Sequence, residues 1–240
     1  MSSPAECEPA APSGRVLRLA VLASGTGSNL GAILDACRSG RIRAQVLVVI
    51  SDRPGATALG RAQAHGIPTL ELPPLSGESR TSHGERLLAA LTRFDIDLVV
   101  LAGYMRILSA EFVQTLAGRL INIHPSLLPR HKGLHTHRRV LEAGELEHGC
   151  TVHFVTAELD GGPPVLQSRV TVLEGDDEAR LAARVLEREH VIFPRVIGWI
   201  ADGRLTCDQG IPRLDGHALD APLLEDRLLE DSSAGEATPR

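Results

Sequence analysis

The sequence predicts an α/β fold in which an open, mostly parallel, twisted sheet carries helices on both faces. The chain has 240 residues, of which 43% are hydrophobic and 23% charged, so it is long and apolar enough for one domain with a sizeable core. Short, nearly continuous apolar runs alternate with amphipathic stretches, which is typical of parallel strands covered by crossover helices. A glycine-rich turn links the first apolar run to the first helical stretch, where sheets of this kind bind ligands.

The first half of the chain repeats a strand–helix unit. Residues 17–23 form the first apolar run, and behind the glycine turn apolar side chains recur at helical spacing at Leu30, Ile33, Leu34 and Cys37. The unit then recurs, with strands predicted over 44–50, 67–72 and 96–102 and helices over 56–65 and 78–93. A fifth strand is predicted over 119–123, shortly before Pro125.

The second half has a different rhythm. Two strand-like runs, 150–156 and 165–173, are joined by a turn-rich segment and predict a hairpin or a mixed sheet edge. Residues 176–203 read as one long amphipathic helix with an acidic first turn and a possible bend at Pro194. Residues 1–16 predict a disordered arm, and residues 208–240 a loosely ordered tail.

Composition excludes several kinds of partner. The 25 Lys and Arg against 30 Asp and Glu leave a net charge of −5, and aromatic residues make up only 2%, so neither phosphate neutralisation nor base stacking favours nucleic acid. The four cysteines form no C-x-x-C pair, which indicates a reducing compartment. The amino terminus lacks a basic start with an apolar stretch, and no apolar run approaches the length of a membrane span. A cytoplasmic protein with no membrane partner is expected.

The glycine turn over 24–29 is a candidate phosphate site. Gly25 and Gly27 allow close backbone approach, and the amides at the helix start, with the hydroxyls of Thr26 and Ser28, can bind an anion. The third glycine of a dinucleotide fingerprint would fall at Leu30 and no lysine follows, so a monophosphate is favoured over NAD or ATP. The alternative is a plain tight turn.

Asn122, His124 and Asp160 are the candidate reactive groups. Strand alternation places the side chains of Asn122 and His124 on one side of the fifth strand, at its carboxyl end. Such a histidine can act as a general acid, although a lone histidine is often structural. Asp160 is either a turn aspartate bonded to its own backbone or the group that orients His124. Histidines cluster over 131–153, but no cysteine or carboxylate has metal-ligand spacing with them, so no metal is expected.

Six segments together resemble the folate-dependent formyltransferases, and the SGTGSN turn with the chain length points to their phosphoribosylglycinamide branch. The segments stand in one collinear order over residues 17–206: LASGTGSNL (22–30), LAGYMRIL (101–108), INIHPSLLP (121–129), GLHTHR (133–138), HGCTVHFVTAELDGGP (148–163) and WIADGRL (199–205). The resemblance implies a formyltransferase domain over 17–207 with a Rossmann-like amino-terminal half. Its phosphate-binding lobe would span about 17–118, and its folate-binding and catalytic lobe about 119–207.

The resemblance also implies the reaction. A formyl group would pass from the co-substrate 10-formyltetrahydrofolate to the amine of N1-(5-phospho-D-ribosyl)glycinamide, giving the formyl product and tetrahydrofolate in purine biosynthesis. The partners would be these small molecules, and the enzyme a monomer or homodimer. One alternative is a formyltetrahydrofolate deformylase that uses the same three residues. Another is a binding protein without catalysis.

Site residues follow from the matching positions. The catalytic residues would be Asn122, His124 and Asp160, and the ribonucleotide site Gly27, Ser28, Asn29 and Glu189. The folate site would comprise Arg80, Met105, Arg106, Ile107, Leu108, Asn122, Thr156, Ala157, Glu158, Leu159 and Asp160. The chain departs from the family at residues 130–133, Arg-His-Lys-Gly, where an aromatic residue is usual.

Overall fold

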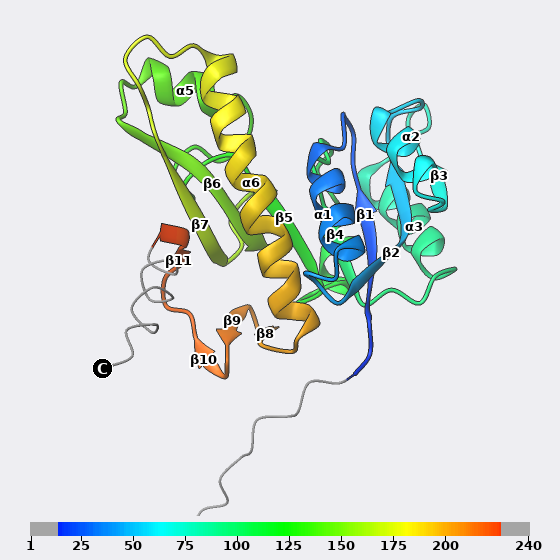
Figure 1. Ribbon diagram of the computed structural model, residues 1–240. Helices are drawn as coiled ribbons and strands as arrows, with labels where there is room; N and C mark the ends of the chain where they lie inside the picture. Colours follow the sequence, from blue (N-terminus) through cyan, green and yellow to red (C-terminus); the bar gives the residue numbers. More distant parts are fainter. Residues whose placement is uncertain (1–13, 227–240) are drawn as a thin grey trace, which may run out of the picture.

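The fold is built on one eight-stranded sheet with the strand order β11-β7-β6-β5-β4-β1-β2-β3. The computed structural model describes residues 14–226 (Figure 1), so most of the predicted amino-terminal arm lies outside the described residues. The strands of this sheet are β1 (Leu17–Leu22), β2 (Ala44–Ser51), β3 (Thr69–Glu71), β4 (Leu98–Leu101), β5 (Leu120–His124), β6 (Glu147–Phe154), β7 (Pro164–Thr171) and β11 (Leu223–Leu224).

Strand direction changes at β5. The pairs among β1 to β5 are all parallel, whereas β6 runs antiparallel to both β5 and β7. The prediction of a mostly parallel sheet followed by a hairpin is therefore confirmed. Because β5 belongs to both parts, its carboxyl end lies where the parallel half meets the hairpin, and this end carries Asn122 and His124.

Helices cover both faces of the sheet, as predicted. They are α1 (Ser28–Arg38), α2 (Thr57–Ala64), α3 (Arg80–Leu91), α4 (Ala110–Thr115), α5 (Thr136–Glu142) and α6 (Glu178–Ala201). Alternate residues of β1 face opposite layers: Leu19 and Val21 pack with α1, α2 and α6, while Ala20 and Leu22 pack with α3 and α4. The aliphatic composition of β1, β2 and β4 suits this burial on both faces.

The long helix α6 begins where its sequence indicates. The Asp177 side chain caps it by accepting a hydrogen bond from the Arg180 amide, and Pro194 lies inside it. Its buried face packs against α1 and against the β6–β7 hairpin, so it spans the two halves of the sheet (Figure 1). Among residues 14–226, no helix combines the length and apolarity that crossing a bilayer requires.

The loose tail predicted from residue 208 is wrong for the residues that the structure describes. β8 (Leu205–Asp208), β9 (Ile211–Leu214) and β10 (His217–Ala218) form a small second sheet, and β11 extends the main sheet beside β7. Glu225 is buried and accepts a hydrogen bond from the Ser168 hydroxyl. These strands are too short to show a hydrophobic period in the sequence, and the polar turns between them resemble irregular chain. Residues 227–240 of the predicted tail lie outside the described residues.

Candidate active site

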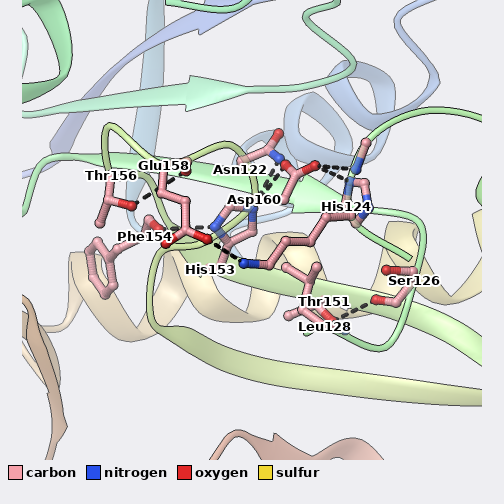
Figure 2. A network of polar contacts seen from close by, with 12 residues as sticks. Asn122, His124, Ser126, Leu128, Thr151, His153, Phe154, Thr156, Glu158 and Asp160 are labelled. Atoms are coloured by element: carbon pink, nitrogen blue, oxygen red, sulfur yellow. Dashed lines mark hydrogen bonds and ion pairs between the residues drawn. The ribbon is translucent and has the colours of Figure 1, made fainter. Parts of the chain in front are cut away.

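Asn122, His124 and Asp160 meet at the carboxyl end of β5 (Figure 2). Asn122 and His124 lie two residues apart on β5, and Asp160 comes from the loop between β6 and β7. The Asp160 Oδ2 atom is 3.4 Å from His124 Nδ1, and both side chains are buried, with 10% and 8% of their surfaces exposed. The structure thus brings the three predicted catalytic residues together, although 36 positions separate His124 from Asp160 in the chain.

The imidazole of His124 has an oxygen acceptor at each ring nitrogen. Its Nε2 lies 3.0 Å from the carbonyl oxygen of His131, and a carbonyl can only accept, so Nε2 carries a hydrogen. Its Nδ1 faces the Asp160 carboxylate. Because Nε2 carries a hydrogen, a neutral ring would turn its Nδ1 lone pair toward the carboxylate, so the geometry fits an imidazolium paired by charge with Asp160.

Asp160 is held by backbone as well as by charge. It adopts a left-handed conformation with φ of 48°, which aspartate tolerates better than most side chains. The amide of Gly133 donates a hydrogen bond to Asp160 Oδ2 at 2.8 Å. The carboxylate therefore has a fixed position between two loops.

The loop over 130–133, where the sequence departs from the pattern it resembles, packs directly against this site. Arg130 and His131 both contact the Glu145 carboxylate, at 3.0 and 2.6 Å, and Lys132 pairs with Glu158 at 2.7 Å. These ion pairs anchor the loop to Glu145 and Glu158. They hold the two backbone groups that contact His124 and Asp160.

His153 is a site residue whose contact with Asn122 sequence reasoning missed. It lies directly opposite Asn122 across the antiparallel β5–β6 pair, and Asn122 Nδ2 donates to His153 Nε2 at 3.1 Å (Figure 2). His153 Nδ1 faces the Phe154 carbonyl oxygen at 2.9 Å and so carries the ring hydrogen, which leaves Nε2 as an acceptor. Burial lowers the pKa of His153 to about 4, so the ring is neutral. Only the strand register, which is not visible in the sequence, reveals this pairing.

A cavity joins most of the predicted folate residues. It has a volume of about 80 Å³ and lies beside Asn122, His153 and Asp160. The predicted members of its lining are Arg106, Ile107 and Leu108 from the segment after β4 and the loop over 156–160, and Tyr104 joins them without having been predicted. Ile107 and Leu159 remain half exposed at 50% and 51%, which leaves an apolar surface at the cavity for a ligand to cover.

Two predicted folate residues do not line this cavity. Arg80 is exposed at the start of α3. The Met105 side chain is 57% exposed, and its backbone amide donates to the Ser24 hydroxyl at 2.8 Å.

The glycine turn has the geometry of an anion-binding loop. Gly27 precedes the first residue of α1 and has φ of 70°. A Cβ atom at this position would lie 2.8 Å from the Cα and Cβ atoms of Ala58 at the start of α2, so only glycine fits. The first amides of α1 lack partners within the helix, as at any helix start, and are oriented toward this turn.

Asn29 and Glu189, which are 160 positions apart, are in contact. Asn29 Nδ2 donates to Glu189 Oε2 at 2.6 Å, and both residues are buried. Burial raises the pKa of Glu189, and the Asn29 hydrogen bond opposes this shift. Asn29 Oδ1 is buried without a hydrogen-bond partner in the described structure, which marks it as an acceptor for a bound polar group.

Two of the clustered histidines bond to each other, whereas His131 and His153 bond to Glu145 and Asn122. His137 Nδ1 and His148 Nε2 are 2.9 Å apart, and burial followed by the charge of His137 lowers the pKa of His148 to about 3. Within residues 14–226, no three His, Cys, Asp or Glu side chains are placed to hold a metal ion.

Comparisons with known proteins agree with the resemblance. The family model described as "Formyl transferase" matches residues 17–197. The phosphoribosylglycinamide formyltransferase of Escherichia coli is 50% identical over 203 residues, which cover 85% of this chain and 96% of that protein. The enzyme of the same name from Haemophilus influenzae is 44% identical over 202 residues, covering 84% and 95%.

Solved structures show the same fold. A phosphoribosylglycinamide formyltransferase from Coxiella burnetii has a TM-score of 0.82 at 43% identity, covering 87% of this chain and all of that one. A formyltetrahydrofolate deformylase from Pseudomonas syringae has a TM-score of 0.77 at 24% identity and is covered over only 66% of its length, so it supports the fold alone.

Proposed function

The chain belongs to the phosphoribosylglycinamide formyltransferases, enzymes of purine biosynthesis, and we propose that Asn122, His124 and Asp160 carry out its formyl transfer. The donor is 10-formyltetrahydrofolate and the acceptor is the amine of N1-(5-phospho-D-ribosyl)glycinamide. The observation that carries the proposal is the convergence of an amide, an imidazole and a carboxylate beside the cavity at the end of β5.

Asn122 stabilises the charge that develops on the formyl oxygen. When the amine attacks the formyl carbon, this oxygen becomes an oxyanion, and a fixed N–H donor is worth most at that point. One N–H of Asn122 is bonded to His153, which fixes the plane of the amide. The second N–H is then directed without further ordering, and Asn122 lines the cavity.

His124 and Asp160 manage charge and protons. The imidazolium of His124 is the source of the proton that the leaving folate nitrogen needs when the intermediate collapses, and its Nδ1 hydrogen faces Asp160. Asp160 both faces His124 and lines the cavity, and a water on this carboxylate would relay the proton. The amine loses its own proton to water or to the same relay, so the transfer is balanced.

The two substrates occupy different parts of the sheet edge that is formed by the carboxyl ends of the parallel strands. The ribonucleotide phosphate binds the amides of Gly27, Ser28 and Asn29, while Glu189 and the free Asn29 Oδ1 accept hydrogen bonds from its sugar or glycinamide groups. The pterin binds the backbone of residues 156–160 and the aliphatic wall at Ile107 and Leu108. The cytoplasmic location and the oligomeric state stay predictions.

The test follows tetrahydrofolate formation with and without the ribonucleotide. The wild-type chain should release tetrahydrofolate only when both substrates are present. His124→Ala and Asn122→Ala should each lower kcat by at least about 100-fold. The exposed His65, at the end of α2, supplies the matched control, and His65→Ala should keep the wild-type rate.

Two outcomes would contradict the proposal. Near-normal turnover of His124→Ala would remove this residue from the chemistry. Formate release without ribonucleotide at the rate of transfer would identify a hydrolase instead.

A further inference from the structure

Ser24 joins the two segments that are proposed to hold the two substrates. It is the first residue of the glycine turn over 24–29, called the phosphate turn below, and lies two positions after the end of β1. Its side chain does not point to either proposed substrate site but toward the ends of β2 and β4, where it is 3% exposed. A buried hydroxyl needs hydrogen-bond partners. Those of Ser24 come from the end of β2 and from residues 104–108, which follow β4 and are called the folate wall below.

Ser24 makes two hydrogen bonds with the segment that follows β4. Its amide donates to the Gly103 carbonyl oxygen at 3.0 Å, and its hydroxyl accepts from the Met105 amide at 2.8 Å. Met105 begins the segment whose next three residues line the folate cavity. The phosphate turn and the folate wall are therefore linked through one side chain.

Asp52 determines which way the Ser24 hydroxyl points. Ser24 Oγ and Asp52 Oδ1 are 2.5 Å apart, and Asp52 is 7% exposed. A carboxylate can only accept, so the single hydroxyl hydrogen points to Asp52 and the oxygen lone pair stays available to the Met105 amide. The Ser24 hydroxyl therefore donates to Asp52 and accepts from the Met105 amide at the same time, and rotating it would break the bond to Asp52.

The carboxylate of Asp52 also lies near the folate wall. Burial raises the pKa of Tyr104, which lines the cavity, and the negative charge of Asp52 raises it further, while Arg106 opposes both. The link thus extends from the end of β2 through Ser24 to residues on both sides of Met105.

We propose that Ser24 is a positioning residue that holds the phosphate turn and the folate wall at a fixed separation, with Asp52 fixing its hydroxyl. The inference rests on the proposed placement of the two substrates. Because Ser24 touches neither substrate, its loss should weaken both binding sites at once and leave the chemistry largely intact.

Ser24→Ala tests the proposal through steady-state kinetics. We expect the KM for the ribonucleotide and the KM for 10-formyltetrahydrofolate each to rise about five- to tenfold, with kcat within about twofold of wild type. A merely structural role would reduce the amount of folded enzyme, and thus the apparent kcat, without moving both KM values. Thermal melting measures the folded fraction.

Matched variants separate the link from general packing. Asp52→Asn keeps an oxygen that accepts from Ser24 and should retain both KM values within about twofold, whereas Asp52→Ala should raise both. If Ser24→Ala fails to fold, Asp52→Ala tests the same link. The control is Ser51→Ala, because Ser51 is the buried serine beside Asp52 and, within residues 14–226, its hydroxyl bonds to backbone atoms of Arg53 alone. It should leave both KM values unchanged.

The outcomes separate the positioning role of Ser24 from the proposed chemistry. The inference is overturned if Ser24→Ala changes one KM alone, if it lowers kcat with both KM values unchanged, or if Asp52→Asn behaves like Asp52→Ala. Full turnover by His124→Ala would instead contradict the proposed chemistry, and the KM values of the Ser24 and Asp52 variants would still report on the link.

Discussion

At the scale of single residues, the amide of Asn122, for which we propose a catalytic role, depends on a histidine that takes no part in the proposed proton transfer. His153 can only accept at Nε2, because its Nδ1 hydrogen is committed to the Phe154 carbonyl oxygen. This acceptor holds one N–H of Asn122 and prevents the amide from turning over. The neutrality of His153 matters equally, since a second cation 3.9 Å from Asp160 would compete with His124 for the carboxylate.

His153→Leu should therefore damage the rate more than substrate binding. We expect kcat to fall by about tenfold or more, with smaller changes in both KM values, because the Asn122 donor loses its fixed direction. His153→Gln offers a carboxamide oxygen in place of Nε2 and should recover much of the rate. Equal losses in both variants would mean that the imidazole has a different role. Stopped-flow measurement of a single turnover reports the step directly.

At the scale of secondary-structure elements, the start of α1 is shaped by its contact with α2. The Gly25 carbonyl oxygen accepts from the Ala58 amide at 3.1 Å, and Gly27 leaves no room for a side chain against Ala58. The amides of the turn are therefore oriented by packing between helices rather than by a ligand. Packing against α2 thus preorganises the turn, which would reduce the entropy cost of binding a phosphate at the proposed site.

Gly27→Ala should push the turn away from α2. The added Cβ meets Ala58 and the backbone must leave its φ of 70°, so we expect a loss of about 1–3 kcal/mol in stability. The KM for the ribonucleotide should rise about tenfold, with a smaller effect on folate. Gly60→Ala, in α2, is the matched control, because a Cβ there meets nothing within 4 Å. Similar KM values in the two variants would contradict the anion-loop assignment.

The same elements show what sequence patterns can and cannot predict. Strands such as β1 and β4 are apolar on both faces, so their runs are visible without knowledge of the fold. Helices α4 and α5, of six and seven residues, are too short to show a period, and they were not predicted. The proximity of Asn122 and His124 follows from alternation within one strand, but the contacts of His153 and Glu189 depend on register and on helix packing.

At the scale of the whole molecule, buried neutral histidines make stability depend on pH. Burial lowers the pKa of each below the ordinary value of 6.5, so the unfolded chain binds protons at pH values where the native state does not. The free energy of unfolding should therefore fall as pH drops below about 6.5, down to about 4 for His153. The histidines with lowered pKa values are His83, His137, His148, His153 and His190.

Urea unfolding between pH 7.5 and 5 measures this dependence. His153 alone should cost about 2 kcal/mol at pH 5, from the 1.36 kcal/mol per pKa unit between 6.5 and the working pH. His153→Gln removes this contribution, so its stability should decline less steeply with acidification than that of wild type. The exposed His65 is the control, and His65→Gln should leave the slope unchanged. Glu189 acts oppositely, because its raised pKa makes the native state hold a proton longer than the unfolded chain does just above pH 4.5. An unfolding free energy that stays flat or rises between pH 6.5 and 5 would show that His153 and His148 are not neutral in the native core.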